Sequence, residues 1–209
     1  MGIIKNKYKS YKVPISNYSL FVNYKGIEMK GIVFTEFMDM VDEVFGVEIT
    51  EEIIEKSDLP SGGAYTSVGT YPHSEIVSLV TSLGAVTGHP VPDLIRAFGK
   101  HMLSRFHGLF PEFFADVTDV TSFLAQVDNH IHVEVRKLYP DADLPSLETT
   151  RLPDGGLEMI YKSNRMMGDL AEGLISGALD HFGNTHICSR EDLQQTGGAQ
   201  CIRFTMTAH

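Results

Sequence analysis

Apolar side chains recur every three or four positions from Met29 to Leu138, a spacing that is typical of amphipathic α-helices. Glycine and proline interrupt the pattern at Gly46, Gly88 and Pro140, where helices are expected to end. Helices are therefore predicted over about residues 29–45, 49–56, 74–87, 91–106 and 118–138. The first two thirds of the chain is thus expected to be all-helical.

After Pro145 the pattern changes to short runs separated by turns. A β-hairpin is predicted around Pro153-Asp154-Gly155-Gly156, because this turn separates two apolar, β-favouring runs. The elements expected in this part are strands at 147–152 and 157–161, a helix at 166–182, and strands at 186–189 and 201–206. The fold class predicted is α+β: a helical subdomain (about 29–145) packed on a subdomain with a small antiparallel sheet and helices (about 146–209).

Residues 1–28 differ from the rest of the chain. They carry five Lys and one Glu, a charge of +4, so the remainder carries −10 minus +4, or −14. They also lack clear apolar periodicity, which predicts a flexible basic arm, or sequence upstream of a natural start at Met29. A small docking arm is the alternative interpretation.

Composition excludes several classes of protein. The net charge of −10 argues against nucleic-acid binding, which favours clustered Lys and Arg. No apolar run reaches the roughly 20 residues that span a bilayer, and no signal peptide is apparent at the N-terminus. Two cysteines, Cys188 and Cys201, are too few for a disulfide framework. A cytoplasmic protein without membrane insertion is therefore expected.

His132 is the candidate metal ligand. It lies beside the apolar stripe of its predicted helix, and a histidine there can bind a metal through one ring nitrogen. His130 is two positions earlier, about 200° away around a helix, so the pair is not expected to share a metal. Taken alone, His132 is better explained as a hydrogen-bonded core residue.

The run Tyr161-x-Ser163-x-Arg165 supplies a second chemical feature. In extended backbone, residues at alternate positions face the same side. Arg offers a bidentate fork for carboxylates, and Tyr and Ser add hydrogen-bond donors. With His132, the run suits a planar ligand with a central metal and carboxylates at its rim, and haem fits that description. A hairpin end with a surface arginine is the alternative.

No motif supports an enzyme. The chain has no H-E-x-x-H, no G-x-S-x-G, no P-loop and no G-x-G-x-x-G. A hydrolase that uses histidines and acidic groups therefore has no support, and a non-enzymatic protein is expected.

Taken together, these features resemble the haem nitric-oxide/oxygen-binding (H-NOX) family, in its bacterial stand-alone NO-sensor type, which is related to the sensor domain of soluble guanylate cyclase. The resemblance covers residues 29–209. Its markers, in chain order, are Met29-Lys30-Gly31-Ile32-Val33, His132-Val133-Glu134-Val135-Arg136-Lys137-Leu138-Tyr139-Pro140, Pro145, and Tyr161-x-Ser163-x-Arg165.

The resemblance implies a cofactor and roles for the marker residues. The cofactor would be heme b (iron protoporphyrin IX), held between the two subdomains. His132 would be the proximal ligand of the iron, and Tyr161, Ser163 and Arg165 would hold the propionates. Pro145 matches the proline that presses on the haem and distorts it.

The resemblance also bears on ligand choice. Oxygen-binding members carry a tyrosine nine residues after the motif tyrosine, and Leu170 occupies that position here. Other matching pocket positions are Val33, Phe37, Phe106 and Leu174. An apolar pocket offers no donor to dioxygen, which carries partial negative charge, but accepts nearly neutral NO. Nitric oxide is the expected ligand, with carbon monoxide as a further candidate; Tyr65 or Tyr71 could still supply a donor.

Two further expectations concern zinc and partners. Some members bind zinc through Cys and His, but Gly168 and Leu193 stand where two of the cysteines would be, so no zinc is expected. The sequence contains no kinase, cyclase or phosphodiesterase, which predicts signalling to a separate chain, in the family commonly a histidine kinase or a cyclic-di-GMP enzyme. The alternative function is a non-haem small-molecule binding module.

Overall fold

The computed structural model describes residues 28–194 and 198–208. The expected basic arm therefore lies outside the described residues, except for Glu28, which begins the first strand. No helix among the described residues is long and apolar enough to cross a membrane.

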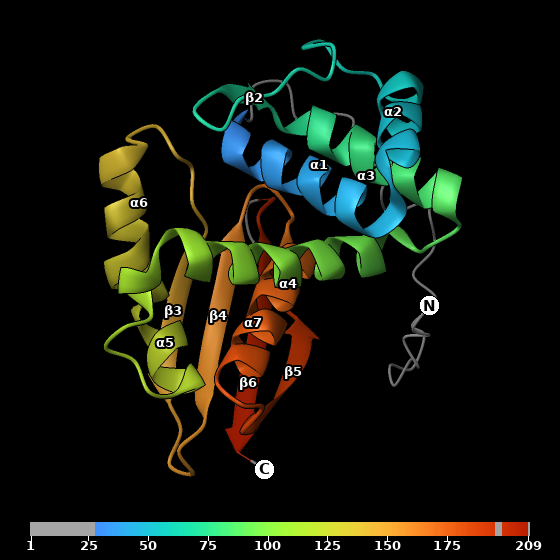
Figure 1. The fold of residues 1–209 in the computed structure, drawn as a ribbon. Helices are drawn as coiled ribbons and strands as arrows, with labels where there is room; N and C mark the ends of the chain where they lie inside the picture. The colour runs from blue at the N-terminus through green and yellow to red at the C-terminus, as the bar shows by residue number, and fades with distance from the viewer. Residues whose placement is uncertain (1–27, 195–197, 209) are drawn as a thin grey trace.

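The N-terminal layer consists of helices around one apolar core (Figure 1). Its elements are α1 (Gly31–Phe45), α2 (Val47–Lys56), α3 (His73–Thr87) and α4 (Val91–Leu109). Helical spacing places the same apolar positions inward on each helix, and the fully buried ones are Phe34, Phe37, Val41, Ile53, Leu79 and Leu83. The four predicted helices are thus present, with ends shifted by at most three residues.

The sequence pattern did not predict a small two-stranded sheet, whose first strand precedes α1. Strand β1 (Glu28–Lys30) pairs antiparallel with β2 (Thr70–Pro72), and Lys30 lies opposite Thr70. The first helix therefore begins at Gly31 and not at Met29, because residues 28–30 are held in extended backbone by this long-range pairing. Three residues are too few for a recognisable strand pattern.

The helix predicted at 118–138 is interrupted. The chain passes through a short 3₁₀ turn, η3 (Pro111–Phe113), before α5 (Val120–Gln126), which Asp119 caps by accepting a hydrogen bond from the Ser122 N–H at 2.8 Å. A π-helical segment, η4 (Val127–Ile131), then leads into α6 (His132–Leu138). A π-helical turn inserts a residue into the helical repeat, so it changes the direction of the side chains that follow, His132 first.

The C-terminal layer is an antiparallel sheet covered by one long helix. Its strands, β3 (Ser146–Arg151), β4 (Leu157–Ser163), β5 (His186–Asp192) and β6 (Gln200–Ala208), lie in the order β3-β4-β6-β5. Helix α7 (Gly168–His181) packs against the sheet. The buried residues of β4 and β6 alternate along each strand and form a second core: Leu157, Met159, Tyr161, Ile202, Phe204 and Met206. This confirms the α+β class.

Helix α4 crosses between the two layers and packs directly on α7 (Figure 1). Glycine makes the crossing close. A Cβ atom on Gly99 would lie 2.4 Å from the carbonyl oxygen of Leu170, and one on Gly173 would lie 2.2 Å from that of Arg96. Because these neighbours are backbone atoms, no side-chain rotation could relieve the clash.

An ion-pair network lies beside the crossing. Asp169 at the start of α7 accepts hydrogen bonds from Arg96 of α4 at 2.9 Å and from Arg190 of β5 at 2.8 Å. Glu172 also accepts from Arg190, at 2.9 Å. The network thus ties the helical layer to both α7 and the edge of the sheet.

The crossing yields a prediction about stability. Gly99→Ala should lower the free energy of unfolding by about 1–3 kcal/mol, because α4 and α7 must separate to admit the methyl group. Gly108→Ala is a matched control on the same helix, since a Cβ there meets nothing within 4 Å. It should be neutral or stabilising by up to about 1 kcal/mol. Urea unfolding measures both, and equal stability of the two variants would contradict the packing argument.

Candidate functional site

A cavity of about 330 Å³ lies between the two layers, within the range of roughly 300–1,000 Å³ that is usual for small-molecule sites. Residues of α4, α5 and α7 line it together with the η4–α6 segment and the inner face of β4. The linker between α6 and β3, strand β1 and the start of α1 also contribute to the wall. Most lining side chains are apolar. The few polar ones among them can orient a ligand.

His132 lies on the cavity wall at the first position of α6. Its side chain is 12% exposed, and burial lowers the pKa of the imidazole, which favours the neutral ring. Its Nδ1 lies 3.2 Å from the Asp128 carboxylate, four residues earlier. A neutral ring that donates from Nδ1 keeps a lone pair on Nε2, which is the arrangement of a metal-binding histidine with an orienting carboxylate.

His130 has a different environment. It is exposed and is not among the residues that line the cavity, and its nearest ring neighbour is Phe113, with centroids 6.2 Å apart. The two histidines therefore do not converge on one site.

Tyr161, Ser163 and Arg165 all line the same cavity, although not for the reason that the sequence pattern suggested. Strand β4 ends at Ser163, so Arg165 lies in the turn beyond it. That turn is closed by the Arg165 N–H, which donates to the Ser163 hydroxyl at 3.1 Å. Tyr161 is buried, and burial raises the pKa of its phenol, which stays a neutral donor at pH 7.

Arg165 has an incomplete set of partners. Its guanidinium donates to two backbone carbonyls, those of Asp143 and Glu28. Its Nε is buried and has no hydrogen-bond partner among the described residues. A buried guanidinium with a spare donor at the edge of an apolar cavity is suited to a carboxylate brought by a ligand.

Apolar residues make up most of the lining. Val33, Phe106, Leu170 and Leu174 are among them, and so is Pro145 from the linker. Phe37 is placed differently: it is fully buried in the helical core, where its ring contacts Phe98 at 5.2 Å between centroids, and it is not among the lining residues.

The two tyrosines considered as donors have other partners. The Tyr65 hydroxyl donates to buried Glu75 at 2.8 Å, and the Tyr71 hydroxyl accepts from the Thr66 N–H at 2.8 Å. Neither residue lines the cavity. Burial and Glu75 also raise the pKa of the Tyr65 phenol, which keeps it neutral. Their phenols therefore serve the helical layer and not a ligand.

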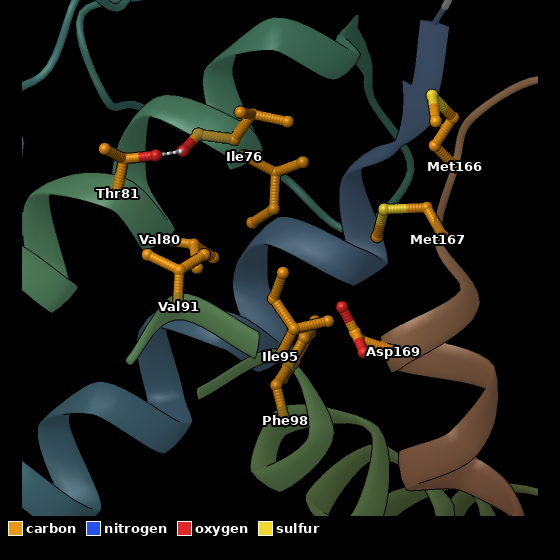
Figure 2. Close-up of a pocket in the computed structure, with 10 residues that line it drawn as sticks. Ile76, Val80, Thr81, Val91, Ile95, Phe98, Met166, Met167 and Asp169 are labelled. Atoms are coloured by element: carbon orange, nitrogen blue, oxygen red, sulfur yellow. Dashed lines mark hydrogen bonds between the residues drawn. The ribbon is translucent and has the colours of Figure 1, made fainter. Parts of the chain in front are cut away.

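A second hollow, of only about 30 Å³, lies where α3 and α4 meet the segment before α7 (Figure 2). Met167 and Asp169 approach Ile95 and Phe98 there, and Met167 also lines the main cavity. Such a volume holds two or three water molecules at most, at about 10–15 Å³ of this measure each. The main cavity is therefore the candidate ligand site.

Among the residues of the site that were not predicted from the sequence are three charged ones: Asp128, Lys30 and Asp141. Asp128 carried a signal, because a carboxylate four residues before a histidine lies on the same helical face. Lys30 and Asp141 meet at the mouth of the cavity at 2.7 Å although they are 111 positions apart. No local pattern could have paired them.

The residues present fit a metal porphyrin. The cavity combines an apolar interior, a neutral imidazole with an orienting carboxylate, and a cationic edge with an unused buried donor. These match, in turn, a flat apolar ring, a central metal and peripheral carboxylates.

Comparison with known proteins identifies the family. The Haem-NO-binding family matches residues 30–188, about three quarters of the chain, and the chain belongs to this family. H-NOX proteins bind Fe(II) haem, which confirms the expected cofactor.

Solved structures share the fold. The Fe(II) unliganded H-NOX protein from K. algicida is 38% identical, with a TM-score of 0.77 over 87% of this chain and 98% of that one. An H-NOX protein from S. oneidensis in the Fe(II)NO state is 29% identical, with a TM-score of 0.75 over 86% and 99%. Soluble guanylate cyclase 89Da of Drosophila melanogaster is 25% identical over 66% of this chain, which spans only 20% of that relative's length.

Cys188 and Cys201 lie on neighbouring strands, β5 and β6, but are not opposite each other, since Cys188 faces Met206. Within residues 28–194 and 198–208, no group of three or more His, Cys, Asp or Glu side chains could hold a metal ion. The absence of a zinc site at Gly168 and Leu193 stays a prediction.

The edge of the site also predicts how stability depends on pH. Burial, together with the charge of Arg165, lowers the pKa of His73 to about 4, against 6.5 for an ordinary histidine. Between these values the unfolded chain binds a proton that the folded chain does not. The free energy of unfolding should therefore fall as pH drops from 6.5 to 4, by roughly 3 kcal/mol at most.

Denaturation at several pH values measures this dependence. His73→Gln should flatten it, because glutamine does not titrate, while the other histidines remain in both proteins. The same dependence in the variant and in the unchanged chain would contradict the assignment to His73.

Proposed function

We propose that this chain is a haem-based gas sensor that binds nitric oxide at ferrous haem and signals to a separate partner protein by release of the His132 helix. The cavity carries the proposal: its lining combines His132, the cation Arg165 and a set of apolar residues, Val33, Phe106, Leu170 and Leu174, that offer no side-chain donor. When bound, ferrous haem would supply an iron that His132 would hold and that could bind a diatomic gas.

In this proposal each lining residue has a defined task. His132 would hold the iron through Nε2, with Asp128 fixing the ring through Nδ1. Tyr161, Ser163 and Arg165 would donate to the propionates, and the unused Nε of Arg165 supports that task. Pro145 would press on one edge of the ring from the linker.

The apolar wall supports selectivity for NO over dioxygen. Dioxygen takes up partial negative charge on binding and gains from a hydrogen-bond donor, whereas NO stays nearly neutral. Leu170, Leu174, Val33 and Phe106 offer no donor, and the phenols of Tyr65 and Tyr71 are engaged elsewhere. Carbon monoxide, also nearly neutral, would be accepted by the same wall.

Signal transmission would start at α6. Its first residue is His132, and its last residues lead into the linker that carries Pro145. The helix is short, exposed on one side, and joined to α5 through a π-helical segment. If His132 leaves the iron, α6 loses an attachment to the cavity and its position can change. The proposed partner is a histidine kinase or a cyclic-di-GMP enzyme. It would bind one position of α6 more tightly than the other.

An absorption spectrum tests the proposal. The reduced protein should show a haem Soret band that moves to the position of a five-coordinate NO complex when NO is added, and air should give no stable dioxygen complex.

His132→Gly should purify with most of its haem missing, and imidazole in the medium should restore the haem content, because free imidazole can occupy the space of the lost side chain. Full haem without imidazole would contradict the ligand assignment. A chain that takes up no haem would favour the non-haem binding module.

The apolar wall around Leu170 yields a separate prediction. Leu170→Tyr should bring a phenol donor into the cavity, so the reduced variant should form a dioxygen complex in air that persists long enough to record. Leu170→Phe is the matched control, since it adds the ring without the hydroxyl. A complex in both variants, or in neither, would contradict the donor argument.

A further inference from the structure

Besides Glu28, the charged residues that line the cavity are two cations and two acids of its mouth. Lys30 on β1 and Arg165 after β4 are the cations, and Asp141 and Asp143, on the linker between α6 and β3, are the acids. Each cation faces one acid: Lys30 lies 2.7 Å from Asp141, and Arg165 lies 3.5 Å from Asp143. Only Arg165 belongs to the motif that resembles a carboxylate-binding run.

Lys30 is the cavity-side member of its pair. Its side chain is 15% exposed, whereas that of Asp141 is 64% exposed. The ammonium group also donates to the Thr70 hydroxyl at 2.9 Å and lies 5.6 Å from the centre of the Tyr139 ring. Pairing of Lys30 with Thr70 in the β1–β2 sheet fixes the backbone from which the side chain reaches the mouth.

An exposed carboxylate is a replaceable partner. Ion pairs with a well-solvated member contribute about 0–1 kcal/mol, because water compensates the freed group. Asp141 can therefore leave Lys30 at little cost and return to water. A largely buried ammonium, by contrast, needs an anion, and a carboxylate at the rim of a bound ligand would supply one from inside the cavity.

We propose that Lys30 is a second carboxylate-binding residue of this cavity, which takes one rim carboxylate of the ligand in place of Asp141 while Arg165 holds the other. The inference rests on the proposed haem-binding function and adds a binding residue to it. Lys30 and Arg165 pair with acids two positions apart on one linker, and Arg165 also donates to the backbone of β1, so the two cations match a ligand with two carboxylates on one edge.

The exchange has a consequence for the linker. Asp141 lies three residues after the end of α6, so its contact with Lys30 ties the end of that helix to β1. Ligand loading would transfer Lys30 from Asp141 to the ligand and remove this tie. Lys30 is thus a binding residue for the ligand, and the partner of its ammonium group also sets how tightly the end of α6 is held.

The test compares loss of haem with loss of haem dimethyl ester from the full chain to excess apomyoglobin. The ester keeps the iron, and so any bond to His132, but has no free carboxylates. Lys30→Met should speed loss of haem by roughly 10-fold, as expected for one charged hydrogen bond at a partly exposed position. It should change loss of the ester by less than about 2-fold, and Lys30→Arg should stay close to the unchanged chain.

Two further variants separate recognition from structure. Lys162→Met is the matched control, since Lys162 is ion-paired with Glu148 at 2.7 Å but does not line the cavity. Asp141→Asn should not speed loss of haem, because Asp141 competes with the ligand for Lys30. Equal acceleration of haem and ester by Lys30→Met, no acceleration of either, or acceleration by Asp141→Asn would each overturn the inference. If the unchanged chain takes up neither haem nor ester, the proposed function itself fails.

Discussion

The direct contact between the backbones of α4 and α7 is the constraint on which the rest of this structure depends. Gly99 and Gly173 allow it, since a methyl group at either position would overlap a carbonyl oxygen of the other helix. The contact fixes how the helical layer meets the sheet. Both helices then supply walls of the cavity, Met102 and Phe106 from α4, and Leu170 and Leu174 from α7.

The two cores are separate, but this crossing joins them. Leu174 packs against both apolar cores, so a shift of α7 would change the packing of each. The ion pairs of Asp169 with Arg96 and Arg190 hold the start of α7 beside the crossing, where the charges are only partly exposed. One side of the cavity is therefore rigid. The other side, formed by η4, α6 and the linker to β3, has few buried residues and is held mainly by polar contacts.

This asymmetry suits a sensor. A ligand held between a rigid wall and a weakly held one transmits a change of occupancy to the weakly held side. His132 stands at the start of that side, and Lys30 and Arg165 hold its far end through the linker. The described residues, 28–194 and 198–208, thus combine a tightly packed wall with a weakly held helix, and the proposed signal transmission rests on this difference.

Much of the fold follows from local patterns, because a helix or hairpin buries one face and repeats its apolar positions accordingly. The helices α1 to α4, the β3–β4 hairpin and α7 were predicted on this basis, and their presence is confirmed. The pattern missed the β1–β2 pair and the π-helical segment before His132. The β1–β2 pair depends on a contact across 40 residues. The π-helical segment depends on packing against β3 and α5. A pattern of neighbouring residues encodes neither of these contacts.

For the site, the order of amino acids alone specifies the chemistry available: an imidazole, two hydroxyls, a guanidinium and apolar residues without a tyrosine at position 170. Tertiary structure decided which of these groups meet. It placed Arg165 in a turn beyond its strand, kept Phe37 in the helical core, and turned the Tyr65 phenol toward Glu75. It also brought Lys30 to Asp141. Side-chain identity is a local property, but the direction of a side chain depends on every element packed around it.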